Sequence, residues 1–387
     1  MYDFALYENI TTAINHQKDL HMIARLLLDS GYSVCVLGYC KEQDLGDGIP
    51  FIHIPNPYKI PEMESGPKYT ILFRQWNFCI NKKKYIRHFL NATKGIAHNY
   101  YCGSFLNETD IKFFKQDPDA NYFFWGLRSH YLSLNYDDFL HPISALDKLQ
   151  KILFIKNHSN IKFFISNEII REEFVKCGIS SDRLILRPER YIDSTLTNHP
   201  SFDNNFSFLS IGTIRSEKRI PMAISAFVQL ARKDIIYNIA GRCNDPKLSK
   251  QICELSEKDI RIYRNDSRLS EQEYQAYFDQ CHFLLLCDTK QKSSVTNGTM
   301  MEALLKEKPI IAPNYDPYKY YIEKYHVGLL FDGTSVESLK SKMVEALNIG
   351  AEQFRSALIQ FKKNYMYEFV QQQFKDELQA IGINPEK

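Results

Sequence analysis

The sequence predicts an α/β protein with two doubly wound domains, and three observations support that prediction. The chain has 387 residues, which is too long for one ordinary core and suits two domains of about 150–200 residues each. Short apolar runs alternate with helical patterns in both halves, as they do where helices connect parallel strands. Apolar residues make up 44% and charged residues 24% of the chain, an ordinary balance for a soluble globular protein.

The first half begins with a helical pattern between two apolar runs. Apolar residues recur at helical spacing from Leu20 to Leu28, and Gly31 ends the helix. The flanking runs predict strands, so this start is a βαβ unit and implies a parallel sheet. In this half the sequence predicts strands at residues 4–7, 32–37, 122–127, 161–166 and 182–186, helices at 20–30, 146–155 and 167–177, and irregular structure at 8–17 and 46–67.

The second half repeats the alternation after a polar segment. Residues 195–205 contain almost nothing apolar and are predicted to link the domains. Residues 335–382 are predicted to be helical, with the last helix at 352–381. An apolar stripe is expected on this tail, formed by Phe354, Leu358, Phe361, Tyr365 and Phe369. Strands are predicted at 206–211, 235–240, 260–263, 282–287, 309–312 and, at the sheet edge, 327–331, and helices at 221–231, 246–255, 271–279 and 299–305.

Charge and cysteine usage narrow the class of protein. The formal net charge is only +2, which argues against nucleic-acid binding, because proteins that track phosphates usually carry a strong basic excess. The local run Lys82-Lys83-Lys84 with Arg87 is either a solvated helix face or a membrane-surface contact. The nine cysteines are scattered singly, which favours free thiols in a reducing cytoplasm over disulfides or zinc.

The chain shows no sign of export or membrane insertion. The N-terminal residues have no basic segment followed by an apolar one, as a signal peptide would. No window approaches the roughly 18 uninterrupted apolar residues of a spanning helix. We therefore expect a cytoplasmic protein, with peripheral contact at the inner face of the cell membrane left open.

A first motif follows the predicted strand 206–211. Gly212 stands at the strand end, where the absence of a side chain lets a ligand approach the backbone. Arg215 and Lys218 follow, and the carboxyl ends of strands are where open α/β sheets bind ligands. Both cations suit phosphate oxygens. The alternative is an ordinary basic loop in which Glu217 is a local partner of the cations.

A second motif lies at the start of the predicted helix 299–305. The sequence Asn297-Gly298-Thr299 brings exposed backbone N–H groups and the positive end of a helix to one place, which favours a phosphate. Glu302 falls one turn inside the helix, where it can accept hydrogen bonds from sugar hydroxyls. The alternative is a Thr-x-x-Glu capping box made by Thr299 and Glu302. Taken together, the two motifs predict a cradle for a diphosphate.

The sequence around these two motifs resembles a known family, the GT-B glycosyltransferases. Within that family it resembles the nucleotide-sugar-dependent group that often carries an E-x7-E motif. A weaker match extends upstream over residues 165–193, whereas residues 40–160 match little. The blocks that carry the resemblance are Ile211-Gly212-x-x-Arg215-x-x-Lys218, Tyr237-Asn238-Ile239-Ala240-Gly241, Glu273-Tyr274-x-x-Tyr277-x-x-x-Cys281-His282, and Gly298-Thr299-Met300-Met301-Glu302-Ala303-Leu304 with Pro309-Ile310-Ile311-Ala312-Pro313.

The resemblance implies an architecture. Two Rossmann-like domains would face each other across a cleft, with an acceptor-binding domain at residues 1–195 and a nucleotide-sugar-binding domain at 203–360. A C-terminal helix at 361–387 would pack back on the N-terminal domain.

The resemblance also implies roles for single residues. Arg215 and Lys218 would hold the donor diphosphate next to Gly212, and Glu302 would contact the ribose. Asn297, Gly298 and Thr299 would surround the β-phosphate and the sugar, and Asn265 and Leu269 would lie near the base. The sequence departs from the family at the first Glu of the motif, because Ser294 stands there. That residue normally touches the donor sugar, so the sugar and the stereochemical outcome stay open.

Catalysis needs groups beyond the cradle. Arg215, Lys218 and the helix N-terminus could stabilise the leaving diphosphate without a metal, and the resemblance implies neither a metal nor another cofactor. His130 follows the predicted strand 122–127, where it could orient the sugar or act as a base, with Arg128 beside it. His16, in the predicted first loop, and His141 are the alternatives.

These observations predict a metal-independent glycosyltransferase. It would move a sugar from a nucleoside-diphosphate donor, UDP- or GDP-linked, to a glycan or lipid-linked acceptor, in bacterial surface polysaccharide synthesis. One alternative is a nucleotide-sugar epimerase with the same cradle. Another is a non-catalytic partner subunit, which Ser294 favours and the charged cradle does not. A dehydrogenase lacks support, since no Gly-x-Gly-x-x-Gly follows the first strand.

Overall fold

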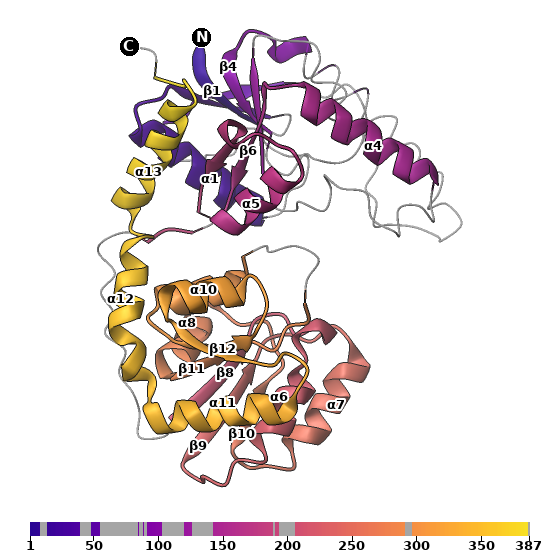
Figure 1. The fold of residues 1–387 in the computed structure, drawn as a ribbon, viewed down its shortest axis with the longest axis vertical. Coiled ribbons are helices and arrows are strands. Elements are labelled where there is room, and N and C mark those ends of the chain that lie inside the picture. Colours follow the sequence, from indigo (N-terminus) through magenta and orange to yellow (C-terminus); the bar gives the residue numbers. More distant parts are fainter. Residues whose placement is uncertain are drawn as a thin grey trace. The chain divides into compact units, whose positions relative to one another are not determined.

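The computed structural model places the chain in two compact units (Figure 1). The first contains Met1–Pro188 and Gln371–Lys387, and the second contains Glu189–Val370. The predicted linker, 195–205, lies outside the described residues. The structure describes residues 1–7, 14–38, 48–54, 84, 88, 91–102, 120–125, 142–188, 190–192, 206–290 and 296–385.

The first unit is built on a parallel sheet of seven strands, in the order β3-β2-β1-β4-β5-β6-β7. Its strands are nearly continuous runs of buried residues, as expected for a sheet covered on both faces. The elements are β1 (Tyr2–Tyr7), α1 (Ile14–Asp29), β2 (Val34–Gly38), β3 (Phe51–His53), β4 (Ala97–Tyr101), β5 (Asn121–Trp125), α4 (Pro142–Asn157), β6 (Ile161–Ile165), α5 (Glu168–Lys176) and β7 (Leu184–Leu186).

Three features of this unit differ from the sequence prediction. Strand β3 falls inside the stretch 46–67 that was expected to be irregular, and β4 falls where no strand was expected. The sequence of β4 hides it, because Asn99 is polar yet buried, with its side-chain amide donating to the Asp3 carbonyl at 2.9 Å. Helix α1 begins at Ile14, so the predicted loop 8–17 is shorter and His16 lies in the helix. Residues 15–19 of α1 are all polar and precede the apolar spacing that starts at Leu20.

The second unit is built on a parallel sheet of six strands, in the order β10-β9-β8-β11-β12-β13. Successive strands run outward from β8 in one direction and from β11 in the other, so the order reverses between these two neighbours. The strands are β8 (Phe206–Ile211), β9 (Ile235–Ala240), β10 (Ile262–Asn265), β11 (Phe283–Leu285), β12 (Ile310–Pro313) and β13 (Gly328–Phe331).

Helices connect these strands, and most match the predicted ranges. Helix α10 was not predicted, and β10 begins two residues later than expected. The predicted edge strand at 327–331 is confirmed as β13. The helices are α6 (Ile220–Phe227), α7 (Pro246–Ser256), α8 (Glu271–Gln280), α9 (Gly298–Leu305), α10 (Tyr318–Tyr325), α11 (Val336–Ile349), α12 (Arg355–Lys363) and α13 (Tyr367–Ala380).

The predicted last helix, 352–381, is divided. A short 3-10 segment precedes α12, and the helix breaks between Lys363 and Tyr367. Because the break changes which face is buried, Phe369 is 50% exposed and does not continue the stripe, whereas Phe354, Leu358, Phe361 and Tyr365 are buried in the core of the second unit. In α13 the buried side chains are instead Val370, Phe374 and Leu378.

Residues 371–387 pack within the first unit. Phe374 contacts Phe164 of β6 with the ring centroids 5.4 Å apart. The guanidinium of Arg171 donates to both carboxylate oxygens of Glu377, at 2.7 and 2.9 Å. The second of these oxygens also accepts the backbone N–H of Leu186, at 3.1 Å. The C-terminal segment is thus part of this unit's core and of its charge network.

The described cysteines are all free thiols, and four of them are buried: Cys35, Cys102, Cys281 and Cys287. Burial raises the pKa of the Cys35, Cys281 and Cys287 thiols to about 12, so these residues pack as small apolar groups. Among the helices that the structure describes, none is long and apolar enough to cross a membrane.

Candidate functional site

Two glycines form the floor of the candidate site, where β8 and β9 end. Gly212 has φ +91°, and a Cβ there would lie 3.3 Å from Lys218 Nζ and 3.7 Å from Thr299 Oγ1. Gly241 has φ +135°, and a Cβ there would meet the Gly212 carbonyl oxygen at 2.3 Å. Only glycine fits at position 241, and the short distances around Gly212 bring both predicted motifs to one place.

Sheet topology explains why the two motifs meet. β8 and β11 are neighbouring parallel strands, with Phe208 opposite Phe283. Lys218 follows β8, and α9 follows β11, so both lie at the carboxyl edge where the strand order reverses. Open α/β sheets bind their ligands at this kind of switch point.

Lys218 is a partly buried cation. Its Nζ donates to the Ile211 carbonyl at 2.7 Å, which holds the ammonium beside Gly212. Burial lowers the pKa of Lys218, and the neighbouring Arg215 adds to that effect, while Asp288 and Glu217 oppose it. An ammonium that is short of solvent interacts strongly with an incoming anion.

Arg215 and Arg219 have different positions. The Arg215 side chain is 67% exposed, and its guanidinium lies 3.7 Å from the Glu217 carboxylate. Glu217 is thus a local partner of Arg215, as the alternative interpretation expected. Arg219, which the sequence analysis did not single out, has φ +45° and donates to the carbonyls of Cys287 and Asp288, at 2.6 and 3.0 Å. Arg219 thereby fastens the Lys218 loop to the chain that follows β11.

The N-terminus of α9 is capped by Asn297. Its Oδ1 accepts the backbone N–H groups of Thr299 and Met300, at 2.9 and 3.1 Å. The alternative of a capping box made by Thr299 and Glu302 is therefore wrong. Asn297 directly precedes the first residue of α9, Gly298, and its short side-chain amide reaches the N–H groups of the first turn. Thr299 Oγ1 faces Gly212 and Glu302 points elsewhere.

A polar network fixes the cap itself. Asn297 Nδ2 donates to the hydroxyl of Tyr318 at 2.9 Å, and that hydroxyl donates to Asp288 Oδ2 at 2.7 Å. Burial and the Asp288 charge raise the pKa of Tyr318 far above its usual range, so the phenol stays a donor. The loop after β11, helix α9 and helix α10 are joined in this way.

Glu302 accepts two hydrogen bonds on one oxygen. Its Oε2 accepts from Arg190 Nη1 at 3.0 Å and from the Tyr274 hydroxyl at 3.2 Å. Burial, followed by the Glu302 charge, raises the pKa of Tyr274, so this phenol also remains protonated. The guanidinium of Arg190 also lies 3.6 Å from the point that a Cβ on Gly298 would occupy.

Of the two residues predicted near the base, Asn265 is the last residue of β10 and Leu269 lies in the segment after it. The Asn265 carbonyl accepts the N–H of Gly241 at 2.8 Å, and its side chain accepts from Ser267 at 2.6 Å. Leu269 is partly buried against the core of this unit. The carboxyl end of β10 is therefore tied to Gly241.

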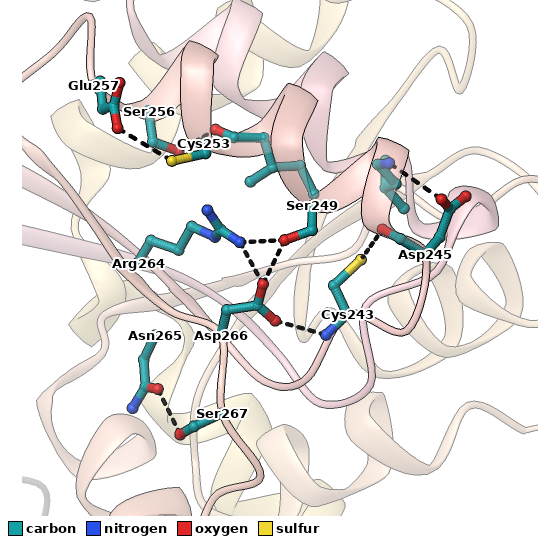
Figure 2. Close-up of polar contacts among 12 residues, drawn as sticks. Cys243, Asp245, Ser249, Cys253, Ser256, Glu257, Arg264, Asn265, Asp266 and Ser267 are labelled. Atoms are coloured by element: carbon teal, nitrogen blue, oxygen red, sulfur yellow. Dashed lines mark hydrogen bonds and ion pairs between the residues drawn. The ribbon is translucent and has the colours of Figure 1, made fainter.

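Figure 2 shows the polar contacts that join the loops after β9 and β10. Asp266 Oδ1 accepts the backbone N–H of Cys243 at 2.7 Å, and Oδ2 accepts Ser249 of α7 at 2.6 Å. Arg264 donates to the same Oδ2 and to Ser249. These bonds tie the loop after β9 to the loop after β10 and to α7.

Several predicted residues lie outside the described residues. They are His130, Arg128, His141 and Ser294, the last at the first position of the E-x7-E motif. His16 lies on α1, and its side chain is among those not described. Within the described ranges, no three His, Cys, Asp or Glu side chains gather as a metal site would require.

Two residues of the polar network were not predicted, although the sequence carries a signal for each. Asp288 directly follows the apolar run 283–287, and Tyr274 belongs to the block Glu273-Tyr274-x-x-Tyr277. No sequence pattern pointed to Arg190, because it is 112 positions away from Glu302 in the chain.

Comparison with known proteins agrees with this geometry. Residues 193–365 match the family model described as glycosyl transferases group 1. The match covers most of the second unit, and the chain as a whole has the GT-B fold. No curated protein sequence matches it. Every cradle residue, from Gly212 to Glu302, lies inside the range that matches the glycosyl transferase model, and Arg190 lies just before it.

The solved structures similar to this chain have low sequence identity and show the fold. Sucrose-phosphate synthase from Thermosynechococcus elongatus is 12% identical with a TM-score of 0.63, and the match covers 98% of this chain and 99% of that one. HepE from Anabaena, solved in complex with UDP, is 13% identical with a TM-score of 0.64, covering 98% and 100%. A glycosyltransferase from Rickettsia africae is 13% identical with a TM-score of 0.63, covering 98% of each chain.

Proposed function

We propose that this glycosyltransferase moves a sugar from a nucleoside-diphosphate sugar to a glycan or lipid-linked acceptor in bacterial surface polysaccharide synthesis. The observation that carries the proposal is the cluster of Lys218, Gly212 and Thr299 at the sheet switch point. A partly buried ammonium, a bare glycine and the start of a helix suit a diphosphate. UDP is the first nucleotide to test, because HepE was solved with UDP.

The proposed chemistry breaks the bond between the anomeric carbon and the diphosphate oxygen. An acceptor hydroxyl forms the new bond to that carbon and gives its proton to a base, for which His130 is our candidate. Charge develops on the leaving diphosphate, and Lys218 and the N-terminus of α9 stabilise it, with Arg215 released from Glu217 to join them. Stabilisation of developing charge by fixed donors is often the largest part of catalysis. We propose that the reaction needs no metal, since these cations do the work that a divalent ion would do.

The acceptor side of the proposal rests on similar structures alone. One of them is WaaG, described as a glycosyltransferase involved in lipopolysaccharide biosynthesis, at 13% identity and a TM-score of 0.59. We propose an acceptor of that general class, reached from the cytoplasm or at the inner membrane surface. His130 remains our proposed catalytic group from the first unit.

A thermal-shift screen tests the donor assignment. UDP, GDP, ADP, CMP and their sugars are added in turn, and a ligand that binds the folded protein raises its melting temperature. We expect one nucleoside diphosphate to stabilise the wild type and Lys218→Met to abolish that stabilisation. If none of the nucleotides shifts the wild type, the proposed function is wrong. A hydrolysis assay with the sugar form of the best ligand then separates a transferase from a binding protein.

A further inference from the structure

Glu302 is held from one side only. Both of its described partners, Arg190 and Tyr274, donate to the same oxygen, Oε2. Its other oxygen, Oε1, has no hydrogen bond within the part of the chain that the structure describes, and the side chain is 19% exposed. A carboxylate clamped through one oxygen presents the other in a fixed direction.

The two clamps differ in origin and chemistry. Arg190 comes from the segment before β8 and supplies a cation, whereas Tyr274 comes from α8 and supplies a neutral phenol whose raised pKa keeps it protonated. Their hydroxyl and guanidinium groups converge on a residue of α9. A carboxylate that two distant elements hold loses most of its rotamer freedom, so little remains to be lost when a ligand binds.

We infer that Arg190 and Tyr274 are positioning residues that aim Glu302 at the ribose of the donor nucleotide. The inference rests on the proposed function, because it needs a nucleotide at the carboxyl edge of this sheet. Glu302 accepts the ribose hydroxyls on Oε1, while Oε2 stays occupied by its two donors. Arg190 and Tyr274 therefore determine how strongly the enzyme prefers a ribonucleotide to a nucleotide that lacks these hydroxyls.

Deoxy nucleotides test this role directly. The affinities of UDP and 2′,3′-dideoxy-UDP, and of GDP and its dideoxy counterpart, are measured by titration calorimetry. Wild type is expected to bind the ribonucleotide about tenfold more tightly, the loss typical of a charge-assisted hydrogen bond. Arg190→Met, Tyr274→Phe and Glu302→Ala are each expected to weaken ribonucleotide binding and leave dideoxy binding unchanged, which brings the two affinities together.

Two variants serve as controls. Arg232→Met removes an arginine of similar exposure, 44% against 46% for Arg190, from its ion pair with Asp234 just before β9. It lies at the amino end of the strand, so the preference for ribose should survive. Arg190→Lys keeps the charge and should restore part of the preference. Tyr274→Phe removes a single oxygen, so it decides the matter if Arg190→Met does not fold.

The outcomes distinguish failure of the positioning role from failure of the proposed function. Equal weakening of ribo- and dideoxynucleotides by Arg190→Met and Tyr274→Phe, or no weakening of either, overturns the positioning role while the diphosphate site stands. Retention of the ribose preference by Glu302→Ala does the same. If wild type binds no nucleotide at all, the proposed function fails, and this inference fails with it.

Discussion

Lys218 is the single side chain on which the candidate site depends most. Its ammonium lies next to Gly212 and Thr299, and burial lowers its pKa. A charge-assisted contact to a phosphate contributes about 1.5–3 kcal/mol. Lys218→Met is therefore expected to weaken nucleoside-diphosphate binding by roughly 10–100-fold in titration calorimetry. Lys342→Met, in the ion pair with Glu345 on α11, is the matched control and should bind as wild type does.

The lowered pKa of Lys218 adds a pH dependence with a definite sign. A lysine with a depressed pKa loses its proton at a lower pH than an ordinary lysine, so wild-type affinity should fall as the pH rises through the alkaline range. Lys218→Met should remove that part of the pH profile. A wild-type affinity that stays constant up to the pH where free lysine titrates would contradict this assignment.

His282 predicts a different pH effect, on stability. Burial, with help from Lys308, lowers its pKa to about 4, and its Nδ1 accepts the Ser207 N–H at 3.1 Å. The unfolded chain then binds more protons than the folded chain between pH 4 and the ordinary value of about 6.5, so stability should rise with pH across that window. The ring is only partly buried, so we expect about 1–2 kcal/mol from urea unfolding.

His282→Asn is the comparison for this pH effect, because it removes the titrating ring. The variant should lose less stability than wild type on acidification from pH 6.5 to pH 4. An equal loss in both proteins would show that other groups are responsible.

At this scale the sequence predicts some residues well and others not at all. Gly212, Lys218 and Thr299 could be placed together because each stands at a strand or helix end, and parallel strands bring those ends to one edge. Arg190 and Glu302 are 112 positions apart, and their contact depends on side-chain directions that no local pattern encodes. The pairing of Arg215 with Glu217 was left open in the sequence, and the structure shows that contact at 3.7 Å.

At the scale of elements, α9 depends on its cap. Asn297 accepts two N–H groups of the first turn and also links the helix to Tyr318. Loss of a capping side chain costs about 1 kcal/mol, so Asn297→Ala should destabilise the protein by about that amount or more in chemical denaturation. Asn297→Asp retains an oxygen for the cap and should recover most of the loss. Equal destabilisation by both variants would show that the cap contributes nothing.

The elements that the sequence missed share a physical cause. Strand β4 carries Asn99, whose burial is compensated by a specific hydrogen bond to the first strand rather than by apolar character. Strand β3 is only three residues long, too short for a period to show. The break between α12 and α13 left the helical spacing of Phe369 intact while turning that side chain to solvent. In each case the local hydrophobic pattern alone does not define the element.

At the scale of the whole molecule, the two α/β units could be predicted because chain length and β–α alternation both survive errors in single elements. The expectation that a C-terminal helix at 361–387 packs on the N-terminal domain followed instead from family resemblance, since nothing in a helical pattern says which sheet it covers. Residues 361–370 belong to the second unit. Residues 371–387 belong to the first unit, where Phe374 packs against Phe164 and Glu377 pairs with Arg171. The C-terminal segment should therefore stabilise a domain that begins some 370 residues earlier in the chain.

Two phenylalanines of α13 test this dependence. Phe374 is fully buried and Phe369 is 50% exposed on the same helix. Truncation of a buried phenylalanine costs about 3–5 kcal/mol, so Phe374→Ala should lower the stability of the first unit by that amount in urea unfolding. Phe369→Ala should change it by less than about 0.5 kcal/mol. Nucleotide binding, which depends on the second unit, should persist in Phe374→Ala under native conditions, and its loss would show that the two units do not fold independently.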